Sequence, residues 1–88
     1  MFHKVRAVDP LPNYMLSVSF ENGEQRKYDV KPLFNKFDAF KTLEGIKGLF
    51  EQVRVDLGGY GVSWNDDIDL SCDELYYNGL KTEGDGHA

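Results

Sequence analysis

The chain has 88 residues, of which 41% are hydrophobic and 14% aromatic, and its formal net charge at pH 7 is −5. A chain of this length forms one domain with a thin core, which argues against a deep catalytic pocket; we expect a non-enzymatic protein without a cofactor. The negative charge repels nucleic-acid phosphates, so direct nucleic-acid binding is not expected and a basic protein partner is favoured.

The cysteine content and the hydropathy indicate a cytoplasmic protein. One cysteine allows no intrachain disulfide, which fits a reducing compartment. The first residues lack the apolar run of a signal peptide, and no stretch reaches the roughly 20 apolar residues that span a bilayer. We therefore expect no membrane association.

The first thirty residues predict three antiparallel strands. Residues 4–9 form the first, and two prolines make residues 10–13 a connection. Residues 14–20 alternate between apolar and polar side chains, as in a half-buried strand. A three-residue turn over residues 21–23 then returns the chain as the third strand.

The register of that turn follows from Gly23. A glycine in the left-handed position of a bulged turn pairs Val18 with Arg26 and Leu16 with Tyr28, so that the apolar faces agree. A two-residue loop centred on the Asn-Gly pair would instead set Val18 against Lys27.

A helical period begins at Pro32, which suits a first helical position. Gly45 and Gly48 interrupt the pattern, so we expect two short helices or turns within residues 31–51. The aromatic side chains predicted to supply much of the core are Phe20, Phe34, Phe37, Phe40, Phe50 and Trp64.

Two adjacent glycines predict a hairpin between residues 53–57 and 60–64. If Gly58 and Gly59 form a two-residue turn, all the apolar residues of both strands lie on one face. The pairs predicted by this register are Leu57 with Tyr60, Val55 with Val62, and Val53 with Trp64.

A final short helix is indicated after this hairpin. Ser71 and Glu74 have the spacing of a capping box, in which each side chain binds the other residue's amide. The helix carries Leu75 inward and is predicted to stop at Asn78 and Gly79 with a left-handed cap.

The order strand, strand, strand, helix, helix, strand, strand, helix predicts an α+β fold. Its sheet is mainly antiparallel, a three-strand meander plus the glycine hairpin, with short helices packed on one face. Residues 1–80 are expected to form the single domain, and residues 81–88 a disordered tail.

The acidic stretch over residues 65–69 is the first candidate site. Asp67, Asp69 and Ser71 have the spacing of a calcium loop, but Cys72 stands where glycine is required and Asn78 where glutamate is required. A solvated turn next to a capped helix fits better, and no metal site is predicted.

Cysteine and histidine chemistry is not indicated either. Cys72 lies at the start of a predicted helix, where a thiol's pKa can fall, but no histidine is near it in sequence, and a buried small residue fits better. His3 and His87 lie at opposite ends of the chain, without the companion ligands of a zinc site.

Four aromatic residues could serve an interaction surface: Tyr60, Trp64, Tyr76 and Tyr77. For each alone, closing the core is the simpler interpretation. Tyr76 and Tyr77 cannot both point inward from one short helix, so one of them is expected to face outward.

The pattern as a whole resembles the family of domain of unknown function 2442 (DUF2442). The residues that carry the resemblance span roughly 4–77: Val5, residues 16–23, Tyr28-Asp29, Leu33, Phe40, Leu43, residues 50–55, residues 64–70 and Leu75-Tyr76. The resemblance implies a small bacterial α+β domain without established enzymatic activity. It also implies relatives with an added helix-turn-helix domain, which this chain is expected to lack, and relatives that act as partners of small toxins.

Two functional hypotheses follow. The first is a non-enzymatic protein-interaction module, an antitoxin-like or regulatory subunit of a small bacterial operon, which binds a basic protein or forms a homodimer. Its predicted contact residues are Asp66, Asp67, Tyr76 and Tyr77. The alternative is a small metal- or ligand-binding protein that uses the acidic turn around Asp69.

Overall fold

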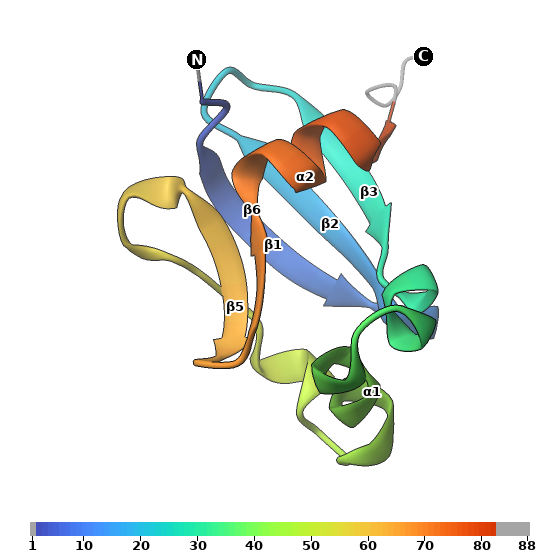
Figure 1. Cartoon of the computed structure of the whole chain (residues 1–88). Helices are drawn as coiled ribbons and strands as arrows, with labels where there is room; N and C mark the ends of the chain where they lie inside the picture. Colours follow the sequence, from blue (N-terminus) through green and yellow to red (C-terminus); the bar gives the residue numbers. More distant parts are fainter. Residues whose placement is uncertain (1, 83–88) are drawn as a thin grey trace.

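The computed structural model describes residues 2–82 and has the predicted α+β architecture (Figure 1). The larger sheet has the strand order β1-β2-β3-β7 and the smaller sheet the order β4-β5-β6, both antiparallel. The larger sheet comprises β1 (Val5–Leu11), β2 (Met15–Phe20), β3 (Gln25–Asp29) and β7 (Leu80–Lys81). The smaller sheet comprises β4 (Arg54–Val55), β5 (Gly61–Asn65) and β6 (Ile68–Ser71). The helices are α1 (Asp38–Gly45) and α2 (Cys72–Asn78), and short 3-10 turns cover Pro12–Tyr14, Lys31–Asn35, Phe50–Gln52 and Leu57–Gly59.

The first strand is longer than the sequence predicts. Pro10 lies within β1 and stands opposite Leu16, whereas the prediction ended the strand at residue 9. Proline is accommodated because β1 is at the edge of the larger sheet, where a missing backbone N–H breaks no ladder. The connection to β2 is therefore confined to the Pro12–Tyr14 turn.

The bulged turn between β2 and β3 is confirmed. Gly23 has φ +91°, and Val18 stands opposite Arg26 as the three-residue loop requires. The amide of Glu24 also donates to Asn22 Oδ1 at 2.9 Å, which fixes the loop. This register places Leu16, Val18 and Phe20 on one face of the sheet, where each is fully buried.

One hydrophobic cluster joins the two sheets and both helices. In Figure 1, α2 and the β5–β6 hairpin lie on the same side of the larger sheet. The smaller sheet contributes Val62 and Trp64, each at most 2% exposed, and α2 contributes Leu75 at 0%. Both sheets therefore depend on the same buried side chains for stability.

Phe37 is not part of the core, contrary to the prediction. The Lys31–Asn35 turn ends at Lys36, and Phe37 has an extended backbone (φ −134°, ψ 121°) before α1 begins. This break interrupts the helical phase, so Phe40 is buried while Phe37 is 54% exposed.

The glycine hairpin has the predicted register but a longer loop. Val55 stands opposite Val62, whereas the last backbone bond joins the amide of Asp56 to the carbonyl of Gly61 at 2.9 Å. The predicted pairing of Leu57 with Tyr60 on the apolar face is wrong, since Leu57 is fully exposed and Tyr60 is 48% exposed. The reason is that the loop contains a 3-10 turn, in which the Gly59 amide donates a hydrogen bond to the Asp56 carbonyl oxygen.

Helix α2 begins as predicted and ends differently. Ser71 Oγ accepts a bond from the Glu74 amide at 3.1 Å, but the Glu74 side chain does not return to Ser71. Its carboxylate instead accepts from Tyr28 and Asn78. Gly79 has φ −79°, not a left-handed value; glycine fits there because a Cβ would meet the Leu75 carbonyl oxygen.

Two strands, β6 and β7, were not predicted from the sequence. Residues 80–81 form β7, which pairs with β3, and Thr82 donates to the Gln25 carbonyl at 3.3 Å. The start of the segment predicted as a disordered tail is therefore ordered, while residues 83–88 lie outside the described part of the chain.

Candidate interaction surface

Aromatic rings from three separate segments meet at one end of the molecule. The Phe2 and Tyr60 rings pack edge to face at 5.3 Å, and the His3 ring stacks on Tyr76 at 3.6 Å with an angle of 4°. His3 also contacts Tyr77 edge to face at 5.6 Å. The contacts form two groups of rings, Phe2 with Tyr60 and His3 with Tyr76 and Tyr77, and the two groups are joined by the chain between residues 2 and 3. Together these five residues are called here the aromatic surface.

The aromatic surface is substantially open to solvent. Phe2 is 60% exposed, Tyr60 48% and Tyr77 64%, whereas Tyr76 is half-buried. Of the two adjacent tyrosines of α2, Tyr77 is therefore the outward one. Exposed apolar groups that gather in one region of a surface are typical of contact sites.

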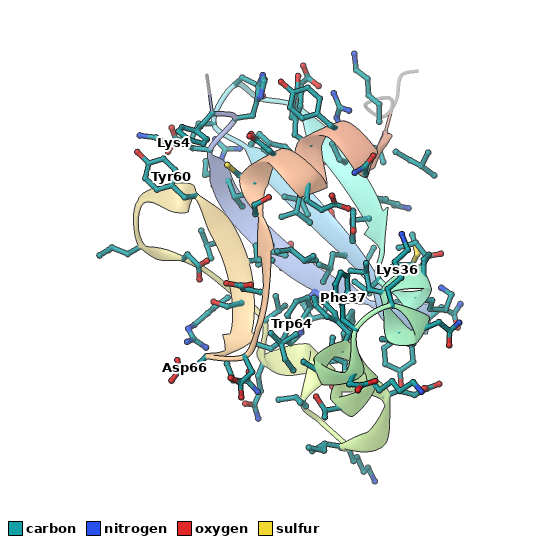
Figure 2. All side chains as sticks on the ribbon, in the orientation of Figure 1. Lys4, Lys36, Phe37, Tyr60, Trp64 and Asp66 are labelled. Carbon is teal, nitrogen blue, oxygen red and sulfur yellow. The ribbon has the colours of Figure 1, made fainter. Side chains whose placement is uncertain are left out.

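The glycine loop brings Tyr60 to this end. Gly59 has φ +82° and packs so closely on β1 that a Cβ would lie 2.7 Å from the Val5 carbonyl oxygen. This close approach sets the Tyr60 ring beside the N-terminal segment, where the Lys4 ammonium lies 5.1 Å from the ring centroid (Figure 2). Glycine is required at residue 59 by both conformation and space.

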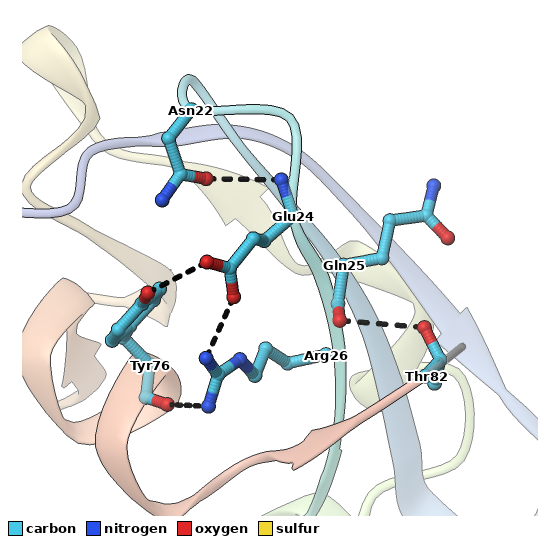
Figure 3. A network of polar contacts seen from close by, with 6 residues as sticks. All are labelled: Asn22, Glu24, Gln25, Arg26, Tyr76 and Thr82. Atoms are coloured by element: carbon cyan, nitrogen blue, oxygen red, sulfur yellow. Dashed lines mark hydrogen bonds and ion pairs between the residues drawn. The ribbon is translucent and has the colours of Figure 1, made fainter. Parts of the chain in front are cut away.

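Tyr76 is held from both faces by its neighbours, of which Figure 3 shows Arg26. The Arg26 guanidinium lies 4.0 Å from the Tyr76 ring centroid, and since His3 occupies one face at 3.6 Å, Arg26 must occupy the other. Arg26 Nη1 donates to the Tyr76 carbonyl oxygen at 2.7 Å. Tyr76 is thereby fixed to β3 as well as to α2.

A carboxylate completes this network. Glu24 accepts from Arg26 Nη2 at 2.7 Å and from the Tyr76 hydroxyl at 2.9 Å (Figure 3). The hydrogen bond from Arg26, and then that from Tyr76, lowers the pKa of Glu24 below its usual value. The carboxylate is therefore ionised at neutral pH, and the aromatic surface rests on a charged network already in place before any partner binds.

The two aspartates predicted as contact residues lie elsewhere. Asp66 and Asp67 form the turn between β5 and β6, where Asn65 Oδ1 accepts from the amides of Asp67 and Ile68. Helix α2 follows the opposite end of β6, and Figure 2 shows Asp66 far from Tyr60. The structure thus does not bring Asp66 and Asp67 together with Tyr76 and Tyr77.

The remaining candidates are structural. Trp64 is 2% exposed and its Nε1 donates to the Phe50 carbonyl at 2.9 Å, so it closes the core. Cys72 is 1% exposed, and burial raises the pKa of its thiol, with Asp73 adding to the effect. Within residues 2–82 no cluster of three or more potential metal ligands is present around Asp69 or elsewhere. His87 lies outside the described residues.

Two members of the aromatic surface were missed by sequence reasoning, Phe2 and His3. Both precede the first strand, where no periodicity gives a signal. Only the pairing of the Val5 end of β1 with Phe20, together with the Gly59 contact, sets them between Tyr60 and α2.

Comparison with known proteins gives one match. The family model described as "Protein of unknown function (DUF2442)" matches residues 5–80. No curated protein and no solved structure matches the chain. None of the helices within residues 2–82 is long and apolar enough to cross a membrane. The family model covers both sheets and both helices, and the chain belongs to the DUF2442 family.

Proposed function

We propose that this chain is a non-enzymatic protein-interaction module and that the aromatic surface is its contact site. The observation that carries the proposal is the exposure of Phe2, Tyr60 and Tyr77, each about half exposed or more, in two ring groups that the consecutive residues Phe2 and His3 bring to one end of the molecule. Tyrosine is among the residues that contribute most to binding free energy in protein interfaces.

Rigidity supports this assignment. Tyr76 is clamped by Arg26 and His3, and it contacts both Phe20 and Tyr77 edge to face at 5.1 and 5.2 Å. A surface whose rings are already positioned loses less conformational entropy on binding than one that must be ordered.

The charge distribution favours a basic partner. Residues 54–74 contain six carboxylates and one arginine, whereas the rest of the chain is nearly balanced. Such an asymmetric field accelerates encounter with a positively charged protein. A cytoplasmic antitoxin-like or regulatory subunit of a small bacterial operon, bound to a basic protein, is the biological role that we propose on this basis and on the family resemblance.

The proposal is tested by affinity capture from a bacterial lysate, comparing three baits at low and moderate salt. The wild-type chain and the control variant Ile46→Ser are expected to retain the same stoichiometric basic protein. The double variant Tyr60→Ser/Tyr77→Ser is expected to lose it, with affinity reduced at least about thirtyfold. Ile46 is a suitable control because it is 55% exposed and lies outside the aromatic surface.

A partner that the Tyr60→Ser/Tyr77→Ser variant retains would exclude the aromatic surface as the contact. Capture of the bait alone would leave self-association, which sedimentation of the same three proteins resolves.

Asp66 and Asp67 give a separate test of the basic partner. Their reversal to lysine should slow association and flatten its salt dependence while leaving the dissociation rate unchanged, because the turn lies away from the contact. An unchanged association rate would count against electrostatic steering.

A further inference from the structure

An open groove of about 460 Å³ lies between β6 and the segment that joins the Lys31–Asn35 turn to α1. Its walls are formed by Asp69, Leu70, Ser71 and Glu74 on one side and by Leu33, Lys36, Phe37 and Phe40 on the other. A second hollow of about 340 Å³ shares Leu33, Lys36 and Glu74 with it and extends it toward Asn78. Figure 2 labels Lys36 and Phe37, which belong to this groove and not to the aromatic surface.

The groove is bordered by a free strand edge. Within residues 2–82, β6 pairs only with β5. The Cys72 amide donates to the Tyr60 carbonyl at 2.8 Å, and this bond sets the phase of the ladder. Because antiparallel pairs alternate, the backbone N–H and C=O groups of Asp69 and the N–H of Ser71 point away from β5.

The other strands of the smaller sheet confirm this phase. The Asp56 amide donates to the Gly61 carbonyl, so Gly61 directs its backbone groups to β4 and not to β6. Ser71, which stands opposite Gly61, therefore has its amide on the free edge. Asp69 and Ser71 are also residues of β6 that line the groove.

The walls of the groove combine apolar and charged groups. Leu33 and Phe40 are buried beneath it, whereas Phe37 is 54% exposed and lies 6.0 Å from Phe40, centroid to centroid. Asp69 is exposed on the strand, with Asp66 and Asp67 in the adjoining turn.

We propose that the groove binds an extended segment of another protein, which adds a strand to the free edge of β6. Side chains of that segment on the same face as Leu70 would pack against Phe37 and Phe40, and those on the face of Asp69 would meet a carboxylate. The segment therefore alternates apolar and basic residues.

The charge of the edge selects this occupant over a second copy of the chain. Two β6 strands paired antiparallel would place both Asp69 side chains on one short ladder and would bring Asp66 and Asp67 of one copy toward the acidic start of α2 (Asp73, Glu74) in the other. Like charges across a ladder are destabilising, and charged edge residues are a common barrier to self-pairing. A basic strand meets the opposite condition.

The test uses a blocked hexapeptide of alternating valine and lysine as the probe, added to ¹⁵N-labelled full-length protein. Amide resonances of Asp69 and Ser71 are expected to shift, and their hydrogen exchange to slow at least about tenfold at saturation. A peptide with glutamate in place of lysine is expected to bind at least about fivefold more weakly.

Two backbone-modified peptides test the strand pairing without altering the protein. One carries N-methyl groups on the valine amides and the other on the lysine amides. Because alternate residues of an added strand face β6, one of these peptides is expected to lose about tenfold in affinity and the other to bind almost as before.

A matched pair of protein variants tests the apolar wall. Phe37→Ser is expected to weaken binding of the valine-lysine peptide at least about tenfold, while Ile46→Ser, at an almost equally exposed apolar residue outside both the groove and the aromatic surface, leaves it unchanged.

Several outcomes would overturn the proposal. Equal binding of both N-methylated peptides would reduce the interaction to charge attraction without strand pairing. Unshifted Asp69 and Ser71 amides at millimolar peptide would show that the edge does not accept a strand. If the hydrogen exchange of these two amides slowed when the protein concentration was raised without any peptide, the edge would pair with a second copy of the chain.

Discussion

Tyr28 joins the larger sheet to α2 through one hydrogen bond. The side chain is 4% exposed, and its hydroxyl donates to Glu74 Oε2 at 2.6 Å. Burial, and then the hydrogen bond to the Glu74 carboxylate, raises the pKa of Tyr28 above its ordinary value of 10.0. Loss of the hydroxyl in Tyr28→Phe is expected to cost about 1 kcal/mol of unfolding free energy at neutral pH.

The raised pKa of Tyr28 predicts the alkaline limit of stability. The folded state keeps the proton at a pH where the unfolded chain has released it, so stability is complete below about pH 10 and falls as pH rises through the folded-state pKa. Absorbance titration should show one tyrosine that ionises only on alkaline unfolding, and Tyr28→Phe should remove it. Tyr77→Phe, at an exposed ring, is the control; if it had the same effect, the assignment to Tyr28 would be wrong.

At the level of elements, Gly45 and Gly79 differ in whether the surrounding atoms leave room for a side chain. Gly45 ends α1, and a Cβ there would meet no atom within 4 Å, so Gly45→Ala is expected to stabilise the protein by up to about 1 kcal/mol. Gly79 follows α2 with an ordinary φ of −79°, but its Cβ would meet the Leu75 carbonyl and lie 3.0 Å from Arg26 Cβ. Gly79→Ala is therefore expected to destabilise by about 1–3 kcal/mol.

Urea unfolding followed by far-ultraviolet circular dichroism measures both changes in unfolding free energy, provided that the dependence of this free energy on urea concentration has the same slope in both variants and the wild type. Equal midpoints for the two variants would show that α2 does not approach β3 as closely as these contacts require.

The sequence predicted the elements whose pattern is local. Gly23 and the alternation of residues 14–20 determine the register of β2 and β3, and both hold in the structure. The pairing of Val55 with Val62 was predictable for the same reason. By contrast, β7 has only two residues, and it forms because the end of α2 places it beside β3. A strand this short has no periodic pattern from which it could be predicted. Phe37 was misplaced because one extended residue resets the helical phase.

The site was only partly predictable. Tyr60, Tyr76 and Tyr77 were selected by residue type, but their proximity depends on Phe2 and His3, which connect segments more than 50 residues apart in the chain. Asp66 and Asp67 were grouped with them on charge alone, and a four-residue strand places the aspartates at the other end of the hairpin. Tertiary contacts of this kind leave no trace in a single sequence.

At the level of the whole molecule, the two sheets and α2 should unfold as one unit. Helix α2 has seven residues, too few for an isolated helix to be stable in water, so it depends on packing and on its bonds to β3. Cys72 of α2 and Trp64 of β5 belong to the same buried cluster. The opening that exposes one is therefore expected to expose the other.

Cys72 allows this cooperativity to be measured, because it is the single cysteine, its thiol is buried, and the pKa of that thiol is raised. Labelling by a disulfide reagent requires an open state, and its rate across urea concentrations gives the free energy of opening. This value is expected to agree within about 1 kcal/mol with the unfolding free energy from Trp64 fluorescence. Labelling at a much lower free energy would mean that α2 opens alone, and the clamp on Tyr76 would then not hold the aromatic surface rigid. Cys72→Ala, which cannot be labelled, provides the blank and shows whether the fluorescence transition itself is unaltered.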